Sequence, residues 1–198
     1  MLRKIAGVCG IASQFVALAI LLFAVLKSPW FSWTENDISV LGVNGSATTL
    51  VNSGFILTGV LSLIFAIGLR RNLLTSRLGQ SGMASLVLGS IMISAIGIFP
   101  RTIGLPHDVA SIAAYIFITL ALFLVGVSAL TASHIVWGLL SLTGFVIMVV
   151  FQLVPWPWSG GSIPQLLISL PWSILTVILG VGLLLGFQPV DVYQEKKV

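Results

Sequence analysis

The sequence predicts an all-α protein, a polytopic bundle of six transmembrane helices with cytoplasmic N- and C-termini. Three observations lead to this fold class. Hydrophobic residues make up 58% of the 198 residues and charged residues only 7%, whereas a soluble domain carries about 25% charged residues. Six apolar runs reach the roughly 20 residues that a helix needs to cross a bilayer. The basic residues fall mostly on one predicted side of the membrane.

The six apolar runs define the predicted spans of a single transmembrane domain, residues 1–198. Each run is apolar on all faces, as a lipid-embedded helix is, and none shows the alternation of a membrane β-strand. The first run is too long for the apolar part of a signal peptide, so we interpret it as a retained helix. The spans are Ile5–Leu26, Ala47–Leu69, Ser81–Phe99, Val109–Leu130, Ile135–Val154 and Pro164–Phe187.

Turn-forming residues separate the spans. Ser46 and Asp108 are placed to act as N-caps of the second and fourth spans. Asn44-Gly45-Ser46 is also a glycosylation sequon, although it lies close to the second span. The short link Thr131–His134 predicts that the fourth and fifth spans are antiparallel neighbours. Pro171 predicts a kink early in the sixth span.

The third span is the richest in small residues. Small side chains let helix backbones approach each other in lipid, where no hydrophobic force drives helices together. We therefore expect this span to lie at the centre of the bundle. The small residues are Gly82, Ser85, Gly89, Ser90, Ser94 and Gly97.

The orientation follows from the uneven distribution of positive charge. If the N-terminus is cytoplasmic, seven of the nine basic residues lie inside, and only Lys27 and Arg101 lie outside. Cytoplasmic loops of membrane proteins carry such an excess of Lys and Arg. We therefore expect a multi-pass protein of the cell membrane. The seven inner residues are Arg3, Lys4, Arg70, Arg71, Arg77, Lys196 and Lys197.

Several kinds of chemistry find no support in the sequence. The spans carry no ionisable side chain away from their ends, which argues against a proton relay; the strong polar groups noted there are Asn52 and Gln152. The two histidines, His107 and His134, lie on opposite predicted sides, so we expect no metal site. We expect no cofactor, no nucleic-acid partner and no disulfide, because Cys9 is the only cysteine.

The predicted outer face is where a binding site is expected. Its tryptophans are interpreted either as an interfacial aromatic belt or as the wall of a pocket for a lipid headgroup or small amphiphile. Glu35 or Asp37 is expected either to be a solvated charge or to pair with Arg101 and hold the first loop over the bundle. The candidate ligand-binding residues are Trp30, Trp33, Glu35, Asp37, Arg101, His107, Trp156 and Trp158, and no catalytic residue is assigned.

Part of this region resembles a known family. Trp33-Thr34-Glu35-Asn36, followed by Ser39-x-Leu41-Gly42, resembles the first outer-loop signature of the domain-of-unknown-function 998 (DUF998) family. The resemblance covers roughly Trp30–Ser111, and it implies a six-helix membrane protein of bacteria or archaea with no established reaction. Further residues similar to the family's pattern are Asn52, Gly97-Ile98-Phe99-Pro100, His107 and Ser111.

Three classes of function are compatible with these observations. The first is the binding or transport of a small amphiphilic or lipid-like ligand at the outer face, with membrane lipid as the partner. The second is an accessory or assembly subunit of a complex with other membrane subunits. The third is an enzyme that modifies lipid of the outer leaflet, in which His107 with Asp37 or Glu35 would form an acid–base pair. The absence of a nucleophile or metal signature makes the enzyme the least favoured class.

Overall fold

The computed structural model describes residues 1–70 and 76–186. These residues form six α-helices and two short 3-10 helices, without a strand. The helices are α1 (Leu2–Leu26), η1 (Ile38–Gly42), α2 (Thr48–Arg70), α3 (Arg77–Ile98), η2 (Arg101–Ile103), α4 (Leu105–Thr131), α5 (Ile135–Leu153) and α6 (Ser162–Leu185).

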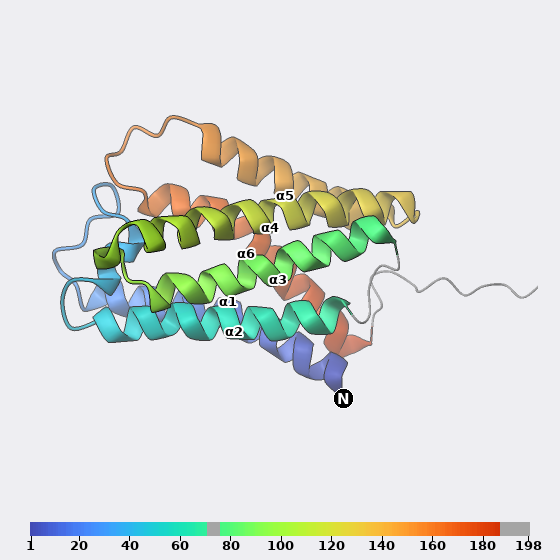
Figure 1. The fold of residues 1–198 in the computed structure, drawn as a ribbon, viewed down its shortest axis with the longest axis horizontal. Coiled ribbons are helices and arrows are strands. Elements are labelled where there is room, and N and C mark those ends of the chain that lie inside the picture. The colour runs from blue at the N-terminus through green and yellow to red at the C-terminus, as the bar shows by residue number, and fades with distance from the viewer. Residues whose placement is uncertain (71–75, 187–198) are drawn as a thin grey trace, which may run out of the picture.

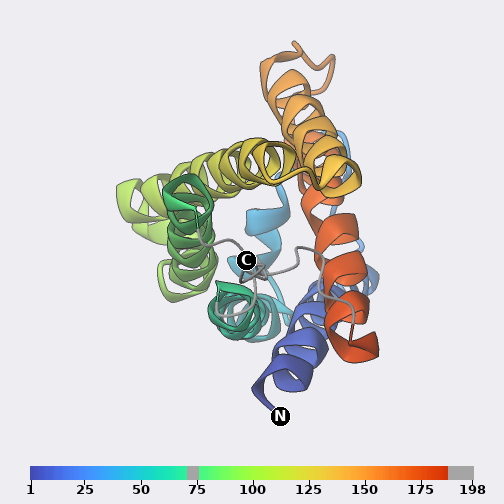
Figure 2. The same ribbon diagram turned by 90° about the vertical axis from the view of Figure 1, so that its right-hand side faces the viewer.

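The six α-helices run up and down and form a closed ring (Figures 1 and 2). Each packs against its neighbours in the sequence, and α6 packs against α1 to close the ring. The connections at residues 27–47, 99–104 and 154–161 all lie at the left-hand end in Figure 1, which we call the capped end. The N-terminus and the turn between α4 and α5 lie at the opposite end.

The helices have the length and composition of membrane spans. Within the described residues, all six α-helices are long and apolar enough to cross a bilayer. Large apolar side chains such as Phe15 (62% exposed) and Ile112 (60%) cover their outer surface, as they do where lipid replaces water. The protein is therefore a multi-pass membrane protein with an all-helical fold, as predicted. The side on which the termini lie stays a prediction.

The interior of the ring is filled mainly by apolar side chains. Phe65 of α2 contacts Trp172 of α6 across the ring, with ring centroids 6.3 Å apart. Ile118 and Leu122 of α4 and Met148 of α5 belong to the same buried cluster. A smaller buried cluster, formed by Ala24, Leu41, Ala47 and Val51, lies where η1 covers the ends of α1 and α2.

Glycines set the close approach of neighbouring helices. A Cβ atom at Gly89 of α3 would lie 2.8 Å from Cγ1 of Ile118 on α4, and one at Gly97 would lie 2.9 Å from Cγ1 of Ile56 on α2. The small residues of α3 thus serve its two neighbouring interfaces. The expectation that this helix is central is wrong, because the helices form a ring in which α3 lies between α2 and α4.

Several helix boundaries differ from the predicted spans. α4 begins at Leu105 rather than Val109, because Pro106 fits the first turn, where no partner exists for the missing N–H. Gly104, not Asp108, is its N-cap, and Asp108 lies in its first turn. α3 begins at Arg77 rather than Ser81, because the Ser76 hydroxyl accepts a hydrogen bond from Gly79 N (3.0 Å).

Smaller differences affect the other helices. α1 begins three residues before the predicted span, and α5 ends one residue earlier. α2 begins at Thr48, so Ser46 is not adjacent to its first residue. α6 spans Ser162–Leu185 instead of Pro164–Phe187 and contains Pro171. The predicted inner residues Arg71, Lys196 and Lys197 lie outside the described residues.

Candidate ligand site at the capped end

The first connection is folded by its own side chains. The Asn36 Oδ1 atom accepts a hydrogen bond from Ser32 N (2.8 Å), and Asn36 N donates to Ser32 O (3.0 Å), so the segment 32–36 folds back on itself. Phe31 lies between two tryptophans, with its ring centroid 6.2 Å from that of Trp30 and 5.3 Å from that of Trp33, both edge to face. This segment therefore brings its own aromatic cluster to the capped end.

Asp37 ties the first connection to two other connections. Its Oδ2 atom forms an ion pair with Nη1 of Arg101 in η2, and its Oδ1 atom accepts a hydrogen bond from Gly161 N (2.8 Å). Nη1 of Arg101 also donates to the Ser39 hydroxyl (3.3 Å). The predicted pairing of a first-loop carboxylate with Arg101 is confirmed for Asp37. Glu35 is exposed.

Backbone groups of the first connection bind the beginning of α6. Thr34 O accepts from Gly160 N (2.9 Å), and Asn36 O accepts from both N and Oγ of Ser162 (3.1 and 2.6 Å). In return, Gln165 Oε1 accepts a hydrogen bond from Ile38 N (3.1 Å). These contacts satisfy the otherwise unpaired amides at the start of a helix. They also place η1 over the ring.

Asn52 links the cap to α2. Its Nδ2 atom donates to Gly42 O (2.8 Å), at the end of η1. Leu41 is fully buried beside it, against the apolar cluster at the ends of α1 and α2. Asn52 therefore provides a hydrogen-bond donor for the last carbonyl group of η1, near the membrane boundary.

His107 and Asp37 have different partners. The His107 side chain is 5% exposed, and its Nδ1 lies 2.8 Å from Phe99 O, the carbonyl that follows α3. The Asp37 carboxylate is held by Arg101 and Gly161. This geometry is that of a structural histidine that joins α3 to α4. It gives little support to an acid–base pair of His107 with Asp37.

The tryptophans lie in two groups. Trp156 stacks on Trp158 with centroids 5.6 Å apart and an interplanar angle of 14°. Trp156 also contacts Phe151, and its Nε1 donates to Phe151 O (3.0 Å). In the described part of the chain, the ring contacts found do not connect this group to the cluster of Trp30, Phe31 and Trp33.

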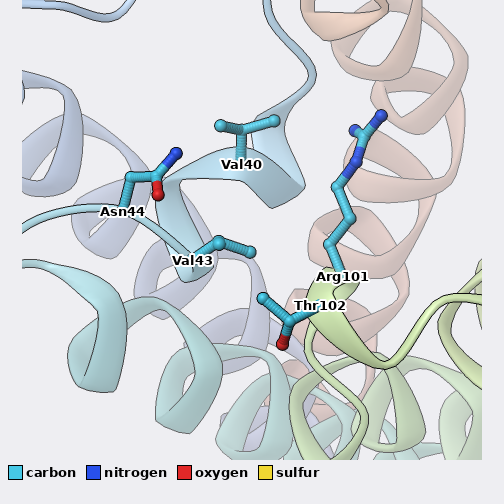
Figure 3. Close-up of a pocket in the computed structure, with 5 residues that line it drawn as sticks. All are labelled: Val40, Val43, Asn44, Arg101 and Thr102. Atoms are coloured by element: carbon cyan, nitrogen blue, oxygen red, sulfur yellow. The ribbon is translucent and has the colours of Figure 1, made fainter.

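A pocket of about 280 Å³ opens between η1 and η2 (Figure 3). Of the predicted candidate residues, it contains Arg101, whose side chain extends along η1 in Figure 3. The sequence analysis missed the other lining residues because isolated loop valines, amides and hydroxyls carry no recognisable signal. The pocket is lined by Val40, Val43, Asn44, Arg101 and Thr102.

Two glutamines within the helices form side-chain hydrogen bonds. Gln152 of α5 is exposed, and its Nε2 donates to the Thr119 hydroxyl (3.2 Å) and to Met148 O (3.1 Å). Gln14, a strong polar group near the middle of α1 that the sequence analysis does not include, is half-buried, and its Nε2 donates to the Ser13 hydroxyl (2.9 Å). Residues 1–70 and 76–186 contain no group of three or more His, Cys, Asp or Glu that could hold a metal ion.

Comparison with known proteins identifies one family. The model of the family described as "Protein of unknown function (DUF998)" matches residues 11–186. This range includes all of α2 to α6 and most of α1. No curated protein and no solved structure matches the chain.

Proposed function

We propose that this chain, which belongs to the DUF998 family, binds an anionic amphiphile at its capped end. The headgroup would occupy the pocket between η1 and η2, and the apolar tail would lie outside it against the bundle. The observation that carries the proposal is the chemistry of the pocket wall. Arg101, Asn44 and Thr102 line one small pocket together with two valines, and the wall is mainly apolar.

Arg101 supplies the charge that selects an anion. A guanidinium has five N–H donors and matches the geometry of a carboxylate or a phosphate. One nitrogen of Arg101 is bound to Asp37 and Ser39, whereas the side chain as a whole is 44% exposed. Asp37 thus holds the guanidinium in place and leaves other donors available to a ligand. Asn44 and Thr102 line the same pocket.

The size of the pocket favours a headgroup over a complete ligand. Pockets for small molecules enclose about 300–1,000 Å³, so a pocket of about 280 Å³ is at the lower end of this range and suits a headgroup. The tail then needs an apolar surface outside the pocket. Phe99 and Ile103, on either side of Arg101 in the chain, are 38% and 51% exposed. An amphiphile matches this combination better than a fully polar solute.

The charge distribution supports the outer leaflet of the cell membrane as the source of the ligand. Lys27 and Arg101 are the basic residues of the capped end, whereas most others belong to the opposite side. Our proposal therefore has the capped end outside the cell. The ligand would enter the pocket from the leaflet next to it.

Native mass spectrometry provides the test. The purified protein is titrated with dioleoyl-phosphatidylglycerol and, separately, with oleate. We expect Arg101→Gln to weaken binding of both probes at least tenfold, which corresponds to about 1.4 kcal/mol. Lys27→Gln is the matched control, because Lys27 has the same charge at the same end but lies against the Phe23 ring (5.6 Å), outside the pocket. The Lys27→Gln variant should bind both probes with the same affinity as the wild type.

A second variant separates loss of binding from loss of the cap. Val43→Glu introduces a carboxylate into the pocket wall and leaves the Arg101–Asp37 pair in place. We expect it to repel both anionic probes without lowering thermal stability. Unchanged affinity in both Arg101→Gln and Val43→Glu would contradict the proposal. A stoichiometric second protein on the wild type extracted from its own membrane, without anionic lipid, would instead favour an accessory subunit.

A further inference from the structure

Three buried hydroxyl groups inside the ring have no hydrogen-bond partner. Thr58 and Ser62 of α2 and Thr176 of α6 are 8%, 1% and 0% exposed. Serines and threonines in helices usually bond to a carbonyl one turn back. Ser90 (to Leu86 O, 2.9 Å) and Ser173 (to Ser169 O, 3.1 Å) do so here. The three hydroxyls do not make this bond in the structure, and no other partner among the described residues satisfies them.

The packing of α1 on α2 brings two hydroxyls to the same depth. Gly10 of α1 faces the Phe65 ring of α2, and one turn lower Ala6 faces Gly68. α1 and α2 are antiparallel. The residue three positions after Gly10 in α1 therefore lies beside the residue three positions before Phe65 in α2. These residues are Ser13 and Ser62.

The packing of α1 on α6 adds a third hydroxyl at this depth. A Cβ atom at Gly180 would lie 2.8 Å from Cγ1 of Ile11 and 2.9 Å from Gly7 O. Gly180 is therefore at the same depth in the bundle as the middle of the α1 turn between Gly7 and Ile11. One turn nearer the capped end, Thr176 lies level with Ser13. Both Ser62 and Thr176 are on the inner faces of their helices, because each is one turn from the Phe65–Trp172 contact across the ring.

These residues form a polar layer in a mainly apolar core. We define the mid-bundle polar layer as Ser13, Gln14, Ser62 and Thr176. Ser13 and Gln14 are at the middle of α1, so the layer lies near the centre of the membrane. The Ser13 hydroxyl donates to Gly10 O (2.7 Å) and accepts from Gln14 Nε2 (2.9 Å), whereas Ser62 and Thr176 have no partner. Thr58 lies one turn nearer the capped end.

We propose that the mid-bundle polar layer binds a neutral hydrogen-bonding group. A buried hydroxyl without a partner is costly, and a group that bonds both Ser62 and Thr176 would remove that cost. The group is neutral because the spans contain no Asp, Glu, Lys, Arg or His that could balance a charge at this depth. A buried water, which makes about three hydrogen bonds, fits this chemistry. The hydroxyl or carbonyl of a neutral lipid fits it equally well.

This site is independent of the proposed anion site. The layer lies about two turns or more below η1 and shares no residue with the pocket of Arg101. The two proposals therefore succeed or fail separately. Binding of oleate or phosphatidylglycerol at the capped end does not test the layer.

Thermal unfolding of the purified protein tests the proposal, because the proposal predicts whether each substitution lowers or raises Tm. We expect Ser62→Ala and Thr176→Val each to lower Tm by about 2–4 °C, because each removes a hydrogen bond to the bound group. Thr176→Ser keeps the hydroxyl and should lose less than Thr176→Val. Ser90→Ala is the matched control for burial, because the Ser90 hydroxyl is 1% exposed but bonds within its own helix.

The opposite sign would overturn the proposal. If the hydroxyls are unpaired in the membrane, their deletion removes a cost, and Tm stays the same or rises. Native mass spectrometry with added dioleoylglycerol then separates the two sources of the group. A neutral lipid that the wild type retains and Thr176→Val loses identifies a lipid. A fall in Tm without any retained lipid identifies water.

Discussion

At the scale of single residues, Asp37 organises the capped end. Its two carboxylate oxygens reach η2 through Arg101 and the start of α6 through Gly161. The two contacts differ in their expected energy. The ion pair is partly exposed, and such pairs contribute about 0–1 kcal/mol. The hydrogen bond to a backbone amide at a helix start also has to be replaced if the carboxylate is removed.

Two substitutions at Asp37 separate these contacts. Asp37→Asn keeps an oxygen for Gly161 N and removes only the charge, so we expect a loss of about 0–1 kcal/mol that shrinks at high salt. Asp37→Ala removes both contacts, and we expect a loss of about 1–3 kcal/mol. Thermal unfolding in detergent at low and high salt measures both. Equal stability of Asp37→Ala and the wild type would contradict this role.

At the scale of elements, each long helix depends on close contact with its neighbours rather than on charge. α3 shows this most clearly, because glycines on two of its faces allow α2 and α4 to approach. Gly82 faces Val125, and Gly89 faces Ile118, both on α4. In lipid, where apolar side chains gain nothing from leaving water, such close packing supplies much of the stability of a helix pair.

Gly89→Leu tests the interface between α3 and α4. The added side chain would enter space occupied by Ile118, and overpacking of this kind costs about 1–3 kcal/mol. We expect Tm to fall by several degrees. Leu88→Met is the control, because Leu88 is 42% exposed on the outer surface of the same helix and should change stability by less than about 0.5 kcal/mol. An equal Tm for both variants would show that the interface has room to adapt.

At the scale of the whole molecule, the ring and its cap make the two ends unlike each other. Residues of three connections cover the capped end and bond to one another. At the opposite end, α4 and α5 meet in a short turn that contains Ser133 at φ 64°. If the positive charges orient the protein as predicted, the covered end faces the outside of the cell.

Labelling of single cysteines tests this orientation. In a Cys9→Ala background, Ser159→Cys lies in an exposed loop of the capped end, and Ala132→Cys lies in the turn between α4 and α5. We expect a membrane-impermeant maleimide to label only Ser159→Cys in intact cells and both after permeabilisation. Reversed labelling would contradict the predicted orientation. If both cysteines were labelled from outside, the prediction that the single span α5 separates them would be contradicted.

The sequence predicted the six spans, but several of their ends differ in the structure. It also predicted a cluster at the capped end, but not most of the residues that line the pocket. The six spans follow from apolar length alone, which is a local property. The start of α4 differs from the prediction because Asp108 suits an N-cap, whereas Pro106 before it fits the first turn of the helix. The pairing of Asp37 with Arg101 was among the alternatives because few charges are present. The pocket residues Val43 and Thr102 were not predictable, because only the position of η1 beside η2 brings them together.

The sequence by itself determined that this is a membrane protein and how many times the chain crosses the membrane. It also predicts which end of the bundle faces outside. Those properties depend on the hydrophobic length of each segment and on the charges that flank it, and both are written locally in the chain. Only the tertiary structure decided that Asp37 binds Arg101 and Gly161, and that Gly10 packs on Phe65. These contacts depend on the register between helices distant in the sequence, which side-chain packing sets.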